Sequence, residues 1–179
     1  ENNLKVYVNG NLEGESTKSG QFSGANGNFA IGSAPGGYEF INGNLDMVRI
    51  WNTALTQDQI QENMLSDNAL VDDGLLADWK VSSGEGNILY DHSGNGNHGV
   101  ISGATWSEDV YVPPIPPVIG GNNSLSFDGV DDLVQLNQDA FTGQTATLMA
   151  WFNPKLNLEN AFDSGKPIYC QGASTTTYA

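Results

Sequence analysis

The chain has 179 residues, enough for one sizeable domain or for parts of two. It carries 21 acidic and only 6 basic side chains, a formal net charge of −15, so it repels phosphate backbones and nucleic acid is not expected as a partner. Its single cysteine excludes an intrachain disulfide, and no apolar run has transmembrane length, so membrane insertion is not expected either.

The first elements read as short strands joined by turns. Residues 4–15 form a predicted hairpin, because apolar residues alternate along its first strand and Asn9-Gly10 is a strong signal for a two-residue turn. A polar loop rich in glycine and serine follows, and Phe29 opens another short strand. The 22 glycines and the absence of long helical patterns favour an all-β domain with many turns.

The stretch from Asn42 to Met64 is the most informative part of the chain. Residues 48–51 are mainly β-branched and aromatic, as in a well-buried strand. Thr56 and Gln59 then have the spacing of a capping box, which predicts a short helix. Three apolar residues share one face of that helix: Leu55, Ile60 and Met64. We expect the charged residues of the strand, Asp46 and Arg49, to pair with each other or with a neighbour.

The second part of the chain repeats the strand-and-turn pattern. Residues 75–79 begin a new apolar strand, and residues 168–170 are also predicted to be a strand. Residues 112–119 hold four prolines, which exclude a central strand and favour an extended, polyproline-like connector.

Several of these segments carry motifs of a known family. Residues 42–60 resemble "NGxIDEVRIWNxALSxxEI", residues 91–99 contain "DxSGNGNHG", and residues 124–136 resemble "LxFDGxDDYVxI". The chain therefore resembles laminin-G-like modules of the concanavalin A-like superfamily. The resemblance implies an all-β, antiparallel jelly-roll β-sandwich, and the residues themselves add one short helix.

The order of the motifs is unusual for that family. Residues 1–68 resemble the C-terminal half of one module, and residues 69–179 resemble the N-terminal half of the following module. Two explanations stay open: the chain is a window cut from tandem repeats, or halves of two consecutive repeats complete one sandwich. In either case we expect a piece of a longer polypeptide.

A structural calcium ion is the cofactor that the sequence suggests. Oxygen-bearing side chains occupy alternate positions of one loop, and Gly96 permits the sharp turn that folds them inward. The loop lacks the closing glutamate of an EF-hand, so further oxygens must come from elsewhere. The candidate ligands are Asp91, Ser93, Asn95, Asn97, Asp128, Asp131 and Asp132. The alternative is a turn whose side chains bond the local backbone.

No catalytic or zinc site is expected. Two histidines and one distant cysteine, Cys170, do not make a zinc ligand set. Glycoside hydrolysis needs two carboxylates across one bond, and the adjacent Asp131 and Asp132 would face opposite sides of a strand. Loop aromatics are better candidates for contact with a sugar or a protein: Tyr38, Phe40 and Tyr111.

The sequence is thus interpreted as a non-catalytic repeat module of a secreted or cell-surface adhesin or filament protein. Its expected partners are glycan or extracellular protein, together with neighbouring repeats or identical chains. The alternatives are a structural spacer in an extracellular fibre and an accessory carbohydrate-binding domain of a larger hydrolase. The predicted core consists of Leu4, Val6, Ile31, Val48, Ile50, Trp51, Phe127, Val134, Leu148 and Trp151.

Overall fold

A computed structural model of the chain describes residues 2–18, 29–33, 39–109, 123–136, 145–155 and 169–171. Three predictions lie outside the described residues: the roles of Tyr38 and Tyr111, and the proline-rich connector at 112–119. Among the described residues, no helix has the length and apolar character needed to span a bilayer.

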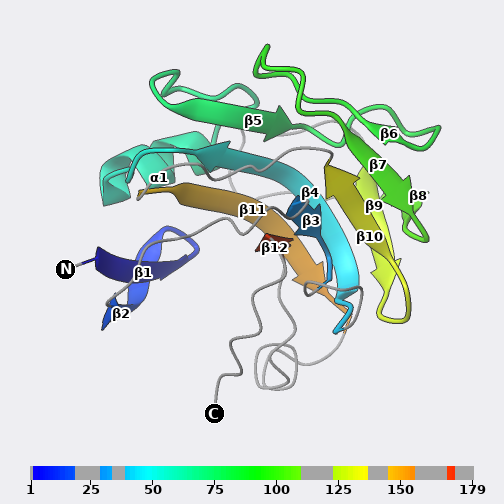
Figure 1. Cartoon of the computed structure of the whole chain (residues 1–179), viewed down its shortest axis with the longest axis horizontal. Coiled ribbons are helices and arrows are strands. Elements are labelled where there is room, and N and C mark those ends of the chain that lie inside the picture. Colours follow the sequence, from blue (N-terminus) through cyan, green and yellow to red (C-terminus); the bar gives the residue numbers. More distant parts are fainter. Residues whose placement is uncertain are drawn as a thin grey trace.

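Two antiparallel sheets make up most of the described structure (Figure 1). The strands of the first sheet, in spatial order, are β11 (Thr147–Pro154), β4 (Asn42–Trp51), β9 (Ser124–Asp128) and β8 (Thr105–Ser107), with β5 (Leu75–Trp79) also paired to β4. Those of the second sheet are β12 (Tyr169–Gln171), β3 (Phe29–Ile31), β10 (Leu133–Leu136), β7 (Gly99–Ser102) and β6 (Ile88–Leu89).

The apolar core draws on both sheets. Val48, Leu125 and Phe127 come from the first sheet, and Ile31 and Val134 come from the second; all five are buried in one cluster. Each large side chain buried in this way contributes about 1.5–3 kcal/mol. The prediction of an all-β antiparallel sandwich is confirmed, and α1 (Gln57–Met64) is the only helix in the described ranges.

The two predicted half-modules share both sheets. β4, from residues 1–68, pairs with β11, β9 and β5, all of which follow residue 68. β3 likewise pairs with β10 and β12. Residue 68 therefore separates two sequence segments whose strands are hydrogen-bonded to each other in one sandwich.

Helix α1 begins as the sequence predicts. Thr56 Oγ1 accepts from Gln59 N at 3.3 Å, and Gln59 Oε1 accepts from Thr56 N at 2.9 Å, which completes the capping box. Its apolar face packs in a second cluster, in which Leu55 and Ile60 are buried with Trp51. Amphipathic spacing alone was enough to predict this face.

Arg49 connects the sheet to the segment after the helix. Its Nε donates to Asp78 Oδ1 at 2.9 Å, and its Nη atoms donate to the carbonyl oxygens of Asn63, Ser66 and Asp67. The partner of Arg49 is therefore Asp78, on the adjacent strand, and not Asp46. Each nitrogen of the fully buried guanidinium donates to at least one acceptor, as a buried charge requires.

Asp46 lies in the same strand, but its buried carboxyl group has fewer hydrogen-bond partners than the Arg49 guanidinium. It is 5% exposed, and its Oδ1 has no hydrogen-bond donor in the described structure. Burial raises the pKa of Asp46 to about 7, the charge of Asp67 adds to this, and a hydrogen bond from the Met47 backbone opposes it.

The hairpin of β1 (Asn2–Val8) and β2 (Asn11–Lys18) forms a separate two-stranded sheet. Its turn lies against α1, where Gly10 O accepts from Gln57 Nε2 at 3.1 Å and from Gln61 Nε2 at 2.9 Å. A side chain at Gly10 would collide with Gln61, so this close approach needs glycine.

Four predicted core residues lie outside the sandwich core. One of them, Trp51, is buried in the second cluster beside α1. Leu4 is 43% exposed and Val6 is 51% exposed, because in the described part of the chain their strand pairs only with β2. Trp151 is half-buried and lies opposite Asp46 in the strand register, away from the apolar cluster. Alternation shows that a strand has an apolar face, but it does not show what covers that face.

Candidate functional site

The loop that connects β6 to β7 is built around the carboxylate of Asp91. Asp91 Oδ1 accepts from the backbone nitrogens of Asp78 and Ser93 at 2.9 and 2.8 Å. Asp91 Oδ2 accepts from Asn97 N and from Ser93 Oγ, both at 2.9 Å. The carboxylate thus closes the loop on itself and ties it to β5.

Two asparagine side chains of this loop also bond β5. Asn95 Nδ2 donates to Leu75 O at 2.9 Å, and Asn97 Nδ2 donates to Leu76 O at 2.7 Å. In return, Trp79 Nε1 donates to Asn97 O at 2.9 Å. These bonds use protein partners, so the loop is ordered by the chain's own groups.

Hydrogen bonding decides the charge state of Asp91. Burial by itself raises the pKa of Asp91, but the bonds from Asp78, Ser93 and Asn97 outweigh burial and lower the pKa below 3.8. The group is therefore a fixed anion at neutral pH whose charge is matched by local donors.

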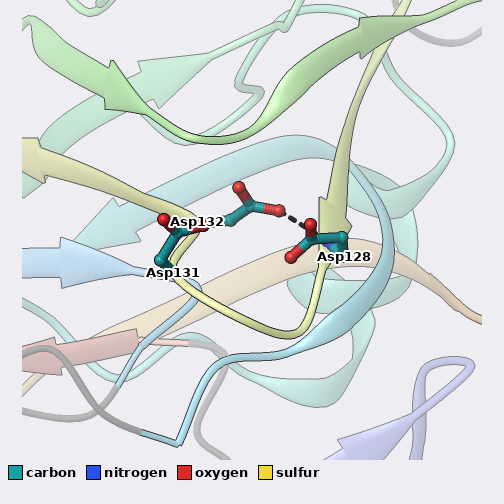
Figure 2. Close-up of side chains that lie close together, drawn as sticks. All are labelled: Asp128, Asp131 and Asp132. Carbon is teal, nitrogen blue, oxygen red and sulfur yellow. Dashed lines mark hydrogen bonds between the residues drawn. The ribbon is translucent and has the colours of Figure 1, made fainter.

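A second acidic group lies in the turn between β9 and β10 (Figure 2). Asp128, Asp131 and Asp132 each place one carboxylate oxygen within 4.8 Å of the others. Asp132 Oδ2 accepts from Asp128 N at 2.5 Å, and Asp128 Oδ1 accepts from Val130 N at 2.8 Å. The adjacent Asp131 and Asp132 lie in a turn, so the expectation that they face opposite sides of a strand is wrong.

The three carboxylates of the turn differ in exposure. Asp128 and Asp131 are exposed, whereas Asp132 is 3% exposed and packs against Gly103, where an added Cβ would collide with Asp132 Oδ1. Burial raises the pKa of Asp132, the charges of Asp128 and Asp131 add to the rise, and the bond from Asp128 N opposes it. A hard cation would relieve this repulsion, and carboxylate oxygens are the ligands that calcium prefers.

The structure does not bring the two groups of predicted calcium ligands together. The Asp91 loop leads into Gly99, which pairs with Leu136, whereas the Asp128 turn leads into Leu133, which pairs with Ser102. The groups therefore lie at opposite ends of β7 and β10, about 10 Å apart along the strands. A single ion cannot contact both, and the calcium site itself stays a prediction.

Of the predicted ligand-contacting aromatics, only Phe40 lies among the described residues, and it is half-buried. An exposed aromatic that the sequence reasoning missed is Tyr90, which is 49% exposed. Its ring lies edge-on to that of His98, with centroids 5.4 Å apart and an interplanar angle of 70°. The alternation around the apolar Leu89 could have indicated that Tyr90 points outward.

Comparison with known proteins adds one match. Residues 1–61 match the model of the concanavalin A-like lectin/glucanase superfamily. No curated protein and no solved structure matches the chain significantly. The match covers the hairpin, β3, β4 and most of α1, the segment that contains the motif at residues 42–60. The match agrees with the family resemblance that the motif at residues 42–60 indicates.

Proposed function

We propose that this chain is a non-catalytic carbohydrate-binding module of a secreted or cell-surface protein. The superfamily match of residues 1–61 carries the proposal, because that superfamily is named for lectins as well as glucanases. Fold membership alone does not fix a function, so the choice between binding and catalysis depends on the side chains.

The acidic turn supports binding over hydrolysis. A glycosidase acid must reach the glycosidic oxygen, with its partner carboxylate about 5–5.5 Å or more away across the sugar. Asp132 has the raised pKa of such an acid, yet it is 3% exposed, bonded to Asp128 N and packed on Gly103. A substrate has no access to this carboxyl group, so Asp132 is better explained as a structural residue.

Charge narrows the class of glycan. The formal net charge of −15 opposes the approach of sulfated or uronic acid-rich polysaccharides. The ligand that suits this surface is a neutral polysaccharide, recognised by hydroxyl hydrogen bonds and by the apolar faces of its sugar rings.

A structural calcium ion is part of the proposal and is assigned to Asp128, Asp131 and Asp132. Their oxygens supply three of the six to eight ligands that calcium takes. The Asp91 loop is left out of the site, because its carboxylate already accepts four hydrogen bonds. When bound, the ion would neutralise the mutual repulsion of these carboxylates.

Affinity electrophoresis tests the function. The chain is run through native gels that contain a neutral polysaccharide (β-glucan, xylan, galactomannan or mannan), beside a gel without polysaccharide. We expect retardation by at least one of them and no release of reducing sugar after prolonged incubation.

Unchanged mobility in every gel, for a sample that melts cooperatively, would contradict carbohydrate binding and favour the spacer role. Release of reducing sugar would instead show a hydrolase. If the chain binds an extracellular protein and no polysaccharide retards it in the gel, its function is protein recognition and not carbohydrate binding.

A further inference from the structure

We infer that Tyr90 and His98 form the sugar-contacting surface of this module, a subsite for one neutral pyranose ring. The inference rests on the proposed carbohydrate-binding function and adds its location. It depends on the placement of the two rings, on the hydrogen bonding of the imidazole and on the rigidity of the loop between them.

The register of two strands turns both rings outward. β6 is the edge strand of its sheet, and Leu89 and Gly99 are paired neighbours that are buried toward the core. Because strand residues alternate between faces, the residues next to this pair point away from the core. Tyr90 and His98 accordingly lie on the exposed face, in contact with each other.

The hydrogen bonding of His98 leaves a donor for a ligand. His98 Nδ1 accepts from the backbone nitrogen of Asp91 at 3.0 Å, so Nδ1 carries no proton and the neutral ring carries it on Nε2. Since the imidazole is exposed, Nε2–H can donate to a sugar hydroxyl beside the tyrosine. An apolar ring beside a fixed polar donor is the usual composition of a small-ligand site.

The subsite is held in place before any ligand arrives. Asp91, next to Tyr90, accepts four hydrogen bonds from its own loop and from β5. Gly94 and Gly96 lie between the rings in sequence, and a side chain added at either would meet no atom within 4 Å. A rigid loop with open space above it loses little entropy on binding, which favours recognition of a small rigid ligand.

The size of the patch favours a sugar over a protein. Among the described residues next to the two rings in the strands, the exposed large apolar residue is Val100, which is 39% exposed. Gln135 pairs with Val100 on the adjacent strand, and its side chain is exposed. A stable protein interface buries roughly 800 Å² on each partner, with a core of several apolar side chains. One tyrosine face with a polar rim matches the apolar C–H face of a single pyranose.

The test compares matched variants in the polysaccharide gel that retards the wild type most. Tyr90→Ala removes the ring and should weaken binding about tenfold or more, equivalent to about 1.4 kcal/mol. Tyr90→Phe keeps the ring and should bind within about twofold of wild type. Val130→Ala, a truncation at a 68% exposed site in the acidic turn, is the control and should bind like wild type. Thermal melts verify that each variant is folded.

The outcomes separate the location from the function. If the wild type binds and Tyr90→Ala binds equally well, the location is wrong while carbohydrate binding stands. If Tyr90→Ala and Val130→Ala lose binding equally, the assignment to this surface is also overturned. If the wild type binds no polysaccharide, the proposed function fails and the subsite fails with it.

Discussion

The Asp91 loop and the Asp128 turn contain the same kind of residues and behave as opposites. In the loop, one buried carboxylate accepts four hydrogen bonds and its pKa is lowered. In the turn, three carboxylates lie within 4.8 Å of one another and the pKa of the buried one, Asp132, is raised. In the loop, protein hydrogen-bond donors stabilise the negative charge of Asp91. In the turn, three negatively charged groups lie close together and repel one another.

This difference shows what a spacing of oxygen-bearing residues can and cannot establish. Alternate acidic and amide residues suit a calcium loop and equally suit a turn that bonds its own backbone. The number of backbone N–H groups that the fold directs at each carboxylate separates the two cases. By that criterion the Asp91 loop is a structural turn, and the Asp128 turn is the better place for a cation.

The largest expected effect is on stability in the Asp91 loop. Asp91→Ala removes the acceptor for three backbone nitrogens and one hydroxyl, so it should lower the free energy of unfolding by about 3 kcal/mol or more. Urea unfolding followed by tryptophan fluorescence measures the change.

Asp131→Ala is the matched control for this experiment. Its carboxylate is exposed, and no hydrogen bond to it is recorded among the described residues, so its removal should alter stability by no more than about 0.5 kcal/mol. Equal effects of the two substitutions would contradict the contrast between the loop and the turn.

Calcium should give the next largest effect, and it should act through the turn alone. At a hundredfold excess over its dissociation constant, an ion that binds only the folded state adds about 2.7 kcal/mol of stability. We expect calcium to raise the melting temperature and excess chelator to reverse the rise. The rise should be absent in Asp131→Asn.

Asn95→Ala tests the predicted calcium ligands of the Asp91 loop in the same thermal melts. It removes a side chain that bonds β5, so its melting temperature should fall, but the increment due to calcium should be unchanged. If the calcium-dependent rise in melting temperature is absent in Asn95→Ala and present in Asp131→Asn, the ion binds at the Asp91 loop. No increment in the wild type would leave the turn as surface charge.

The smallest effect, taken per pH unit, is a pH dependence that extends the contrast to Asp46. Its pKa rises from 3.8 in the unfolded chain to about 7 in the fold, so between these values the folded state binds more protons and stability falls as the pH rises. The expected slope is about 1.4 kcal/mol per pH unit between pH 5 and 6. Asp46→Asn should reduce this slope to the smaller part that the raised pKa of Asp132 contributes, as measured by urea unfolding in chelator.

Asp91 should show the opposite sign in the same series. Because its folded pKa is lowered, its contribution to stability is complete above about pH 4 and is lost as the pH falls through the folded value. Asp91→Asn should therefore reduce the loss of unfolding free energy below about pH 4. It should leave the pH dependence between pH 5 and 6 unchanged. A slope in Asp46→Asn equal to that of the wild type would show that another group causes it.

Much of the fold was predictable, because local chemistry specified it. The Asn9-Gly10 turn, the Thr56–Gln59 capping box and the buried strand at residues 48–51 each depend on neighbours within a few positions. Burial of Leu4 was not predictable, since it depends on whether a distant strand covers the hairpin. The same limit applies to Arg49, whose partner Asp78 is 29 residues away.

The site was predictable in its residue types but not in its grouping. Asp128, Asp131 and Asp132 come together because the turn is short, whereas Asp91 lies at the other end of the same strands. The outward direction of Tyr90 follows from its alternation with Leu89, but its contact with His98 follows from the pairing of Leu89 with Gly99, which the local pattern does not show.

The sequence by itself determined the all-β class, the capped helix, the net negative charge and the motifs on which the family match of residues 1–61 depends. Only the tertiary structure decided which carboxylates are satisfied by backbone donors, which apolar faces are covered and which rings reach the surface. The reason is physical: turns and caps are closed by residues a few positions apart, whereas solvation and hydrogen bonding of a side chain depend on strands that the chain brings together from afar.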